Sequence, residues 1–202
     1  MAGANLALLG EELIQFGRAE EVSAGTFKLS RLLRGRRGTE WAAGEHRIGE
    51  PFCLINHGIL PIEVPAGAVG TELAAIAHGV GDAAPLPEAR RNLTAEAMRP
   101  PSPCHLRLWR TDGGGIGAQW VRRSHGGWVW LDEVGVPDDR FAELYRVTID
   151  GPGGQVILEL ASPGLACEPA DLPASSGDAI RLTVATVGPR AVSHGISAIL
   201  TL

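Results

Sequence analysis

Residues 104–124 read CHLRLWRTDGGGIGAQWVRRS and hold two short apolar runs, Cys104 to Arg110 and Gly117 to Arg123, on either side of a glycine-rich break. Runs of this length between turn residues are typical of β-strands. The pattern continues in four further runs at Glu143 to Asp150, Gln155 to Leu160, Asp178 to Val187 and His194 to Leu202. About seven short strands in about 100 residues predict an immunoglobulin-like or fibronectin type III sandwich.

Two large side chains are candidates for the centre of this sandwich. Trp120 falls on an early strand and Tyr145 on a later one. A core as small as this one depends on a few large residues. We therefore predict that Trp120 and Tyr145 are buried together.

The first half of the chain also reads as β-structure. Asn5 to Leu9 and Glu12 to Gly17 flank a Gly10-Glu11 turn, which predicts a hairpin that begins near the N-terminus. Residues 26–33 alternate apolar and polar side chains, and Phe52 to Leu60 is a third apolar run. Residues 70–80 fit a helical stripe or a strand, and we favour a strand. The sequence predicts a small β-barrel-like or β-sandwich module here.

Consecutive prolines mark the predicted domain boundary. Arg99 is followed by Pro100, Pro101, Ser102 and Pro103, and such a run favours an extended linker over a helix or a central strand. We expect a β-rich module at residues 1–99, a linker at residues 100–103 and the sandwich at residues 104–202.

Composition excludes several classes of protein. The 202 residues are 45% hydrophobic and 20% charged, which predicts a folded chain, and the net charge of −5 gives no electrostatic reason to expect a nucleic-acid partner. The N-terminus lacks the basic region of a signal peptide, and no apolar run approaches the roughly 20 residues that span a bilayer. We expect a protein made in the cytoplasm, without a signal peptide or membrane insertion.

No motif indicates catalysis, a metal or a cofactor. The six histidines lack ligand spacing, and the three cysteines, Cys53, Cys104 and Cys167, lie far apart, which predicts buried free thiols. The glycine run before Trp120 lacks the third glycine of a dinucleotide loop and reads as a hairpin turn. No serine stands in the G-x-S-x-G pattern. We predict no catalytic, metal-binding or cofactor-binding residues and no enzymatic activity.

The basic stretch RLLRGRRGTEW, residues 31–41, is the most unusual local sequence. Its cations are Arg31, Arg34, Arg36 and Arg37. They could bind phosphate or nucleic acid, but Glu40, Glu45 and Glu50 are nearby and can form bidentate pairs with arginine. We predict that Arg34, Arg36 and Arg37 fix a bent loop or form an interface.

Four of the five tryptophans, Trp109, Trp120, Trp128 and Trp130, lie in one stretch. Trp128 and Trp130 alternate with Val129, so on a strand they share one face. They could complete a core and an interface, or they could form a platform on which a sugar ring stacks.

The RLLRGRRGTEW stretch, followed by His46, Gly49 and Phe52, resembles the C-terminal region of the tail-tip hub protein of gene transfer agents and long-tailed phages. The similarity continues at residues 106–108, at residues 119–124 and at residues 143–147, which match the W-x-R-R and E-x-Y-x-V patterns of a fibronectin-like module in that family. The resemblance identifies structural positions and carries no catalytic residue.

The resemblance implies a structural component of a phage-type tail tip or baseplate hub, a host-specificity protein that contributes to tail assembly and host-surface attachment. It implies a place in the virion tail, other tail-tip or baseplate proteins as partners, and a trimer within the full hub. The alternative, from the residues alone, is a carbohydrate-binding module that recognises a cell-surface glycan. The exposure of Trp128 and Trp130 would distinguish the two hypotheses.

Overall fold

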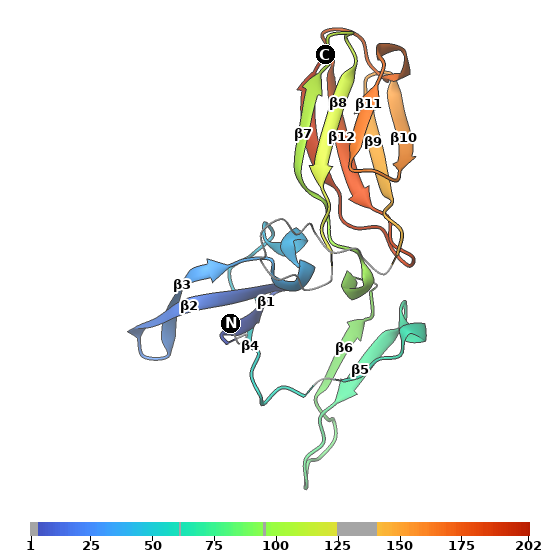
Figure 1. The fold of residues 1–202 in the computed structure, drawn as a ribbon. Coiled ribbons are helices and arrows are strands. Elements are labelled where there is room, and N and C mark those ends of the chain that lie inside the picture. The colour runs from blue at the N-terminus through green and yellow to red at the C-terminus, as the bar shows by residue number, and fades with distance from the viewer. Residues whose placement is uncertain (1–3, 61, 95, 125–140) are drawn as a thin grey trace. The chain divides into compact units, whose positions relative to one another are not determined.

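The computed structural model describes residues 4–60, 62–94, 96–124 and 141–202, and the chain divides into two compact units, Met1–Ala68 and Val69–Leu202 (Figure 1). We call them the N-terminal unit and the C-terminal unit. The regular elements of the described residues are β-strands and short 3₁₀ turns, so the all-β prediction is confirmed. These residues include no helix that is long and apolar enough to cross a membrane.

The N-terminal unit is built on one antiparallel sheet with the strand order β3-β2-β1-β4. Its strands are β1 (Leu6–Leu9), β2 (Glu12–Ser23), β3 (Thr26–Leu33) and β4 (Phe52–Leu54). The predicted hairpin is confirmed, since Leu9 pairs with Glu12 across the Gly10-Glu11 turn. The described sheet is open, with β3 and β4 at its edges, and does not close into the barrel-like form considered from the sequence.

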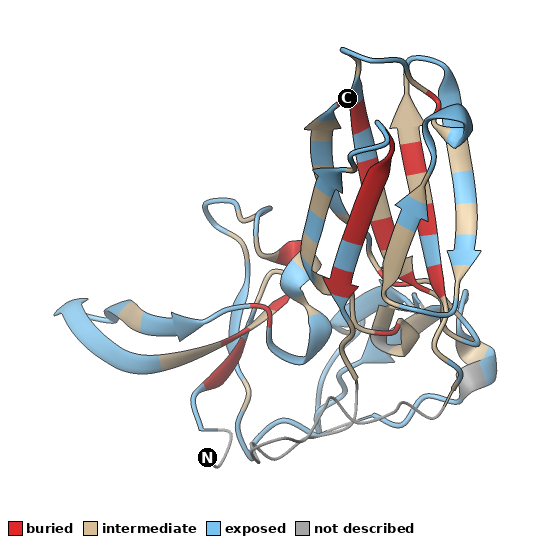
Figure 2. Ribbon diagram, turned by 45° about the horizontal axis from the view of Figure 1, so that its top comes forward, coloured by how far each residue is buried: buried red, intermediate tan, exposed pale blue. Residues whose placement is uncertain are grey.

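The sheet extends into a two-stranded ribbon, which we call the arm, formed by residues 18–30 of β2 and β3. Only the first part of β2, up to Gln15, pairs with β1, and beyond it β2 pairs with β3 alone. Residues 17–28 are all exposed, as the colouring in Figure 2 shows for this ribbon. The arm therefore gains little from a hydrophobic core of its own unit.

The segment between β3 and β4 folds back onto the sheet. It forms two 3₁₀ turns, η1 (Arg36–Gly38) and η2 (Glu40–Ala42), and both pack against β2. A third turn, η3 (Ala66–Ala68), ends the unit. The buried apolar residues of the described N-terminal unit are few, namely Leu6, Ala7, Ile14 and Ala42.

The C-terminal unit begins with a hairpin of β5 (Glu72–Ile76) and β6 (Glu88–Asn92), followed by η4 (Glu96–Met98). The strand favoured for residues 70–80 is therefore confirmed. A sandwich of two antiparallel sheets follows. One has the order β11-β8-β7 and the other β10-β9-β12-β13 (Figure 1). Seven strands in sheets of three and four confirm the predicted fibronectin-like sandwich.

The strands of the three-stranded sheet are β7 (Cys104–Arg110), β8 (Ile116–Val121) and β11 (Gly164–Cys167). Those of the four-stranded sheet are β9 (Tyr145–Gly151), β10 (Gly154–Leu160), β12 (Ala179–Thr186) and β13 (Ile196–Thr201). A turn, η5 (Pro169–Asp171), follows β11. The sequence did not predict β11, because its four residues, GLAC, lack a polar alternation and begin within an apparent turn.

Alternating side chains from both sheets form the sandwich core. Ile116, Ala118 and Trp120 come from β8, and Tyr145, Val147 and Ile149 come from β9, all with at most 2% of their surface exposed. The Trp120 and Tyr145 rings meet edge to face, with their centroids 5.2 Å apart at an interplanar angle of 78°. The Tyr145 hydroxyl donates to Glu143 Oε1 at 2.6 Å. Burial, together with this hydrogen bond, raises the pKa of Tyr145. The predicted core is confirmed.

The proline segment at residues 100–103 belongs to the C-terminal unit. Pro100 and Pro103 are buried, and Pro101 O accepts a hydrogen bond of 3.1 Å from Thr186 Oγ1 at the end of β12. Just before them, Arg99 Nη1 donates to Val192 O, and Glu96 Oε2 lies 2.8 Å from His194 Nε2. These contacts fix the segment to the sandwich, so the chain divides between Ala68 and Val69 rather than at residues 100–103.

Candidate functional site

A buried carboxylate stands at the start of β2. Glu12 has no exposed surface, and it accepts hydrogen bonds from Arg34 Nε at 2.8 and 2.9 Å and from Arg34 Nη2 at 2.6 Å. The Gly35 N–H also donates to Glu12 Oε1, at 2.6 Å. A buried carboxylate is tolerated only when it is paired in this way.

His46 joins this carboxylate to a second one. Its Nε2 lies 2.6 Å from Glu12 Oε2, and its Nδ1 is hydrogen-bonded to Glu50 Oε1. The doubly protonated ring can donate to both carboxylates. We call the four residues Glu12, Arg34, His46 and Glu50 the Glu12 network. With His46 protonated, the network holds two positive and two negative charges and is neutral.

The network shifts the pKa values of its members. Burial alone would raise the pKa of Glu12, but hydrogen bonds from Arg34, His46 and Gly35 outweigh it and lower the pKa to about 2. The hydrogen bond to Glu12 raises the pKa of His46 above its ordinary value of 6.5, with Glu50 adding to the shift against the opposing effect of burial. Both shifts favour the charged forms.

The same residues fix the shape of the segment between β3 and β4. Arg34 Nη2 donates to Ala43 O at 2.6 Å, and Thr39 Oγ1 accepts a hydrogen bond of 2.9 Å from the Leu13 N–H. Gly35 has φ of 60°, and a Cβ at this position would lie 2.8 Å from the Cα of Glu40. Only glycine fits here without a shift of the backbone. The segment is thus tied to two neighbouring residues of β2, Glu12 and Leu13.

The predicted arginine sites have different surroundings. Arg34 is paired with Glu12, 22 residues away in sequence, and not with Glu40, Glu45 or Glu50. Arg36 and Arg37 are exposed, and neither forms an ion pair with another described residue. Trp128 and Trp130, the predicted interface or glycan contacts, lie outside the described residues.

Sequence reasoning missed Glu12 because a glutamate next to a turn reads as solvated. A signal was present in the alternation, since Glu12 shares its strand face with Ile14, and that face is the buried one. The prediction of buried thiols also differs from the structure. Cys53 is exposed on the edge strand β4, and Cys104 and Cys167 are only partly buried.

The geometry of the Glu12 network suits a structural task. Both oxygens of Glu12 accept hydrogen bonds from the protein, and the carboxylate has no exposed surface at which a substrate could bind. Among the residues that the structure describes, no group of three or more histidine, cysteine, aspartate or glutamate side chains is placed to hold a metal ion.

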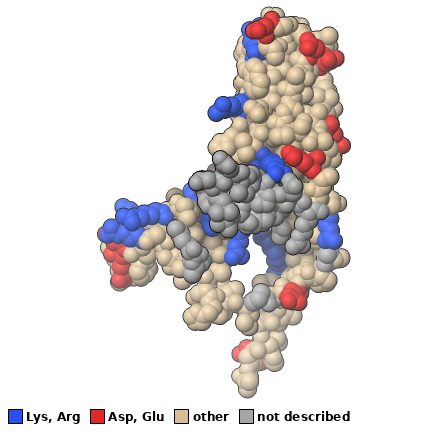
Figure 3. Space-filling model, in the orientation of Figure 1, with Lys and Arg blue, Asp and Glu red and all other residues tan. Residues whose placement is uncertain are grey.

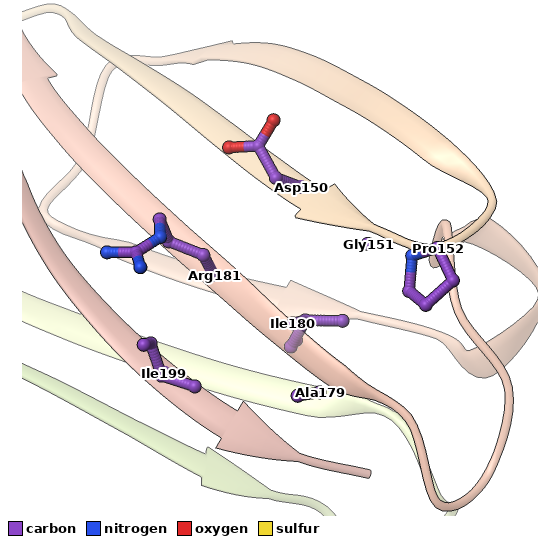
Figure 4. Close-up of a pocket in the computed structure, with 7 residues that line it drawn as sticks. All are labelled: Asp150, Gly151, Pro152, Ala179, Ile180, Arg181 and Ile199. Atoms are coloured by element: carbon purple, nitrogen blue, oxygen red, sulfur yellow. The ribbon is translucent and has the colours of Figure 1, made fainter.

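The C-terminal unit has a shallow hollow of about 370 Å³ on its four-stranded sheet (Figure 4). Asp150 of β9 and Arg181 of β12 are cross-strand neighbours that project beside it, and Ile199 of β13 completes its surface. The remaining described lining residues are Gly151, Pro152, Ala179 and Ile180. Among these described lining residues Asp150 has the only carboxylate, and no histidine, cysteine or hydroxyl group accompanies it.

Comparison with known proteins gives one family match. Residues 1–53 match the model of a family described as Rcc01698-like, C-terminal, which is associated with gene transfer agents. A search of curated proteins finds no match. The matched segment contains the arm and all four residues of the Glu12 network.

Among solved structures, the rat CD45 extracellular region, domains d3–d4, matches with a TM-score of 0.39 and 10% sequence identity. The alignment covers 92% of this chain and 94% of that chain. A likeness this distant has no bearing on function.

Proposed function

We propose that the chain is a structural component of a gene-transfer-agent-like, phage-type tail tip or baseplate hub, with a role in tail assembly and host-surface attachment. The observation that carries the proposal is the family match at residues 1–53. The matched residues form the open sheet with its arm and the Glu12 network. The chemistry of the network supports a shape-holding role over catalysis, and we propose that the protein is not an enzyme.

The arm is the part best suited to assembly. A two-stranded ribbon is at best marginally stable alone in water, because it buries too little surface. One face of the arm is mainly apolar, with Ala19 paired to Leu29 and with Phe27, which is 57% exposed, paired to Glu21. A ribbon of this kind is stabilised when a partner covers the apolar face.

The opposite face of the arm is polar. Arg18 pairs across the strands with Ser30, and Glu20 pairs with Lys28. Arg18 and Glu20 also form an ion pair of 3.1 Å on the surface. Figure 3 shows basic and acidic side chains close together on this ribbon. The arm is therefore amphipathic, and we propose that it lays Phe27 and Leu29 on a neighbouring tail-tip protein while its charged face stays in water.

This proposal places the protein in the tail of a virus-like particle, within a hub that is a homo-oligomer, a trimer by the family resemblance. The test is immunogold electron microscopy of particles from a producing strain that carries an epitope-tagged full-length chain. We expect gold at the end of the tail. Its absence from purified particles, while the tagged chain is present in the cell, would overturn the proposal.

A further inference from the structure

Trp109 lies on the outer face of the three-stranded sheet of the sandwich. It is 45% exposed, and it stands directly across from Gly117 of β8. A Cβ added at Gly117 would fall 2.4 to 2.5 Å from Cε2, Cζ2 and Nε1 of the indole. Those atoms are at the junction of the two indole rings, so the ring covers the glycine and its other side is turned outward.

The cross-strand neighbours of the ring are too small to cover its outer side. Gly117 pairs in turn with Ala166 of β11. The row of cross-strand partners that begins at Trp109 therefore continues with a glycine and an alanine. No large side chain of this row stands beside the ring. The indole therefore lies over the buried Gly117 with the methyl group of Ala166 beyond it, and the ring and this methyl group form an apolar platform.

The next row of the same face is polar. Arg107 pairs with Gln119, and Gln119 pairs with Gly164, and the side chains of Arg107 and Gln119 are both exposed. Side chains two residues apart on a strand share a face, so Arg107 lies beside Trp109. An arginine and an amide thus border the platform with hydrogen-bond donors and an acceptor.

We propose that this surface, formed by Trp109 over Gly117 and by Ala166, Arg107 and Gln119, binds a hexopyranose unit of a polysaccharide. The axial C–H bonds of a pyranose give it one apolar face, which stacks on an indole, while its equatorial hydroxyls reach polar groups at the rim. A peptide in the polyproline conformation needs a groove lined by several aromatic rings, and a nucleic acid needs a wider basic surface. The surface has one aromatic ring and one cation.

This inference goes beyond the proposed tail-tip function, because it rests on the outer face of the C-terminal unit alone. Its test is affinity electrophoresis of the full-length chain in native gels that contain dextran, galactomannan or β-glucan. We expect retardation by at least one of these polysaccharides. Trp109→Ala should weaken binding at least tenfold, Trp109→Phe less, and Gln119→Ala several-fold.

The matched control is Ile199→Ala, which removes an exposed apolar side chain from the other sheet and should leave retardation unchanged. Thermal melting of each variant separates loss of binding from loss of fold, and Gln119→Ala still tests the surface if Trp109→Ala unfolds. Absence of retardation in all three gels, or full retardation of both Trp109→Ala and Gln119→Ala, would overturn the inference. Neither result would test the proposed location of the chain in a tail tip, which the electron microscopy tests separately.

Discussion

The two units of this chain are stabilised by different kinds of interaction. The sandwich buries a large aromatic pair and a continuous set of aliphatic residues from two sheets. The N-terminal unit buries only a few small or medium apolar residues in its described part, and at its centre stands the fully buried carboxylate of Glu12. In a unit that buries little apolar surface, the hydrogen bonds of paired charges fix the loop onto the sheet.

The largest effect is expected in the sandwich core. Trp120→Ala removes a ring that is 2% exposed and packs edge to face on Tyr145, so it should cost about 3–5 kcal/mol of unfolding free energy. Urea unfolding of the full chain, followed by circular dichroism, measures this loss. Ile157→Ala, at a 56% exposed position of the same sandwich, is the control and should cost less than about 1 kcal/mol. A mild Trp120→Ala would contradict the assigned core.

A smaller loss is expected when the ionic network is broken. Glu12→Gln removes the charge that Arg34 and His46 face, and it should cost about 2–3 kcal/mol in the N-terminal unit. This is at the low end for a buried pair because the Arg34 side chain is 42% exposed and can be rehydrated. Hydrogen exchange should show faster exchange of the Gly35 amide, which donates to Glu12, and unchanged protection in the sandwich. Unchanged Gly35 protection would show that the network does not hold the loop.

The stability of the N-terminal unit should depend on pH through the Glu12 network. His46 has a raised pKa in the folded state, so its contribution is complete below its ordinary pKa of 6.5 and is lost as the pH rises through the raised value. Glu12 contributes fully above its ordinary pKa of 4.5 and loses its contribution as the pH falls toward about 2. The free-energy difference between wild type and His46→Asn should therefore be greatest between pH 4.5 and 6.5. A free-energy difference between wild type and His46→Asn that grows above pH 8 would contradict the proposed role of protonated His46.

The next pair of variants concerns the backbone of the loop between β3 and β4. Gly35→Ala combines a φ of 60° with a Cβ position 2.8 Å from the Cα of Glu40, and should cost about 1–3 kcal/mol. Gly38→Ala is the matched control, since it also has a positive φ, of 87°, but open space around the added methyl group. Its cost should be about 1 kcal/mol. Thermal melting compares the two variants, and equal losses would show that the close approach at Gly35 contributes nothing.

Sequence patterns predicted the sandwich better than they predicted the network. The alternation around Trp120 and Tyr145 is local, so strand faces and the buried pair followed directly from it. The pairing of Glu12 with Arg34 and His46 depends on the position of a folded loop, which no local pattern specifies. The role of the proline segment was missed for the same reason, because its attachment to Thr186 joins residues 85 positions apart.

We propose that the arm is an assembly element. The measurement that tests this role is the amount of the full-length chain per purified particle. Phe27→Ser removes the exposed ring from the apolar face, and Lys28→Ser changes the adjacent residue on the polar face. Both variants should fold, since both positions are exposed. We expect quantitative immunoblotting to find Phe27→Ser strongly depleted from particles and Lys28→Ser near the wild-type amount. Equal incorporation of Phe27→Ser and wild type would contradict a role of the arm in assembly.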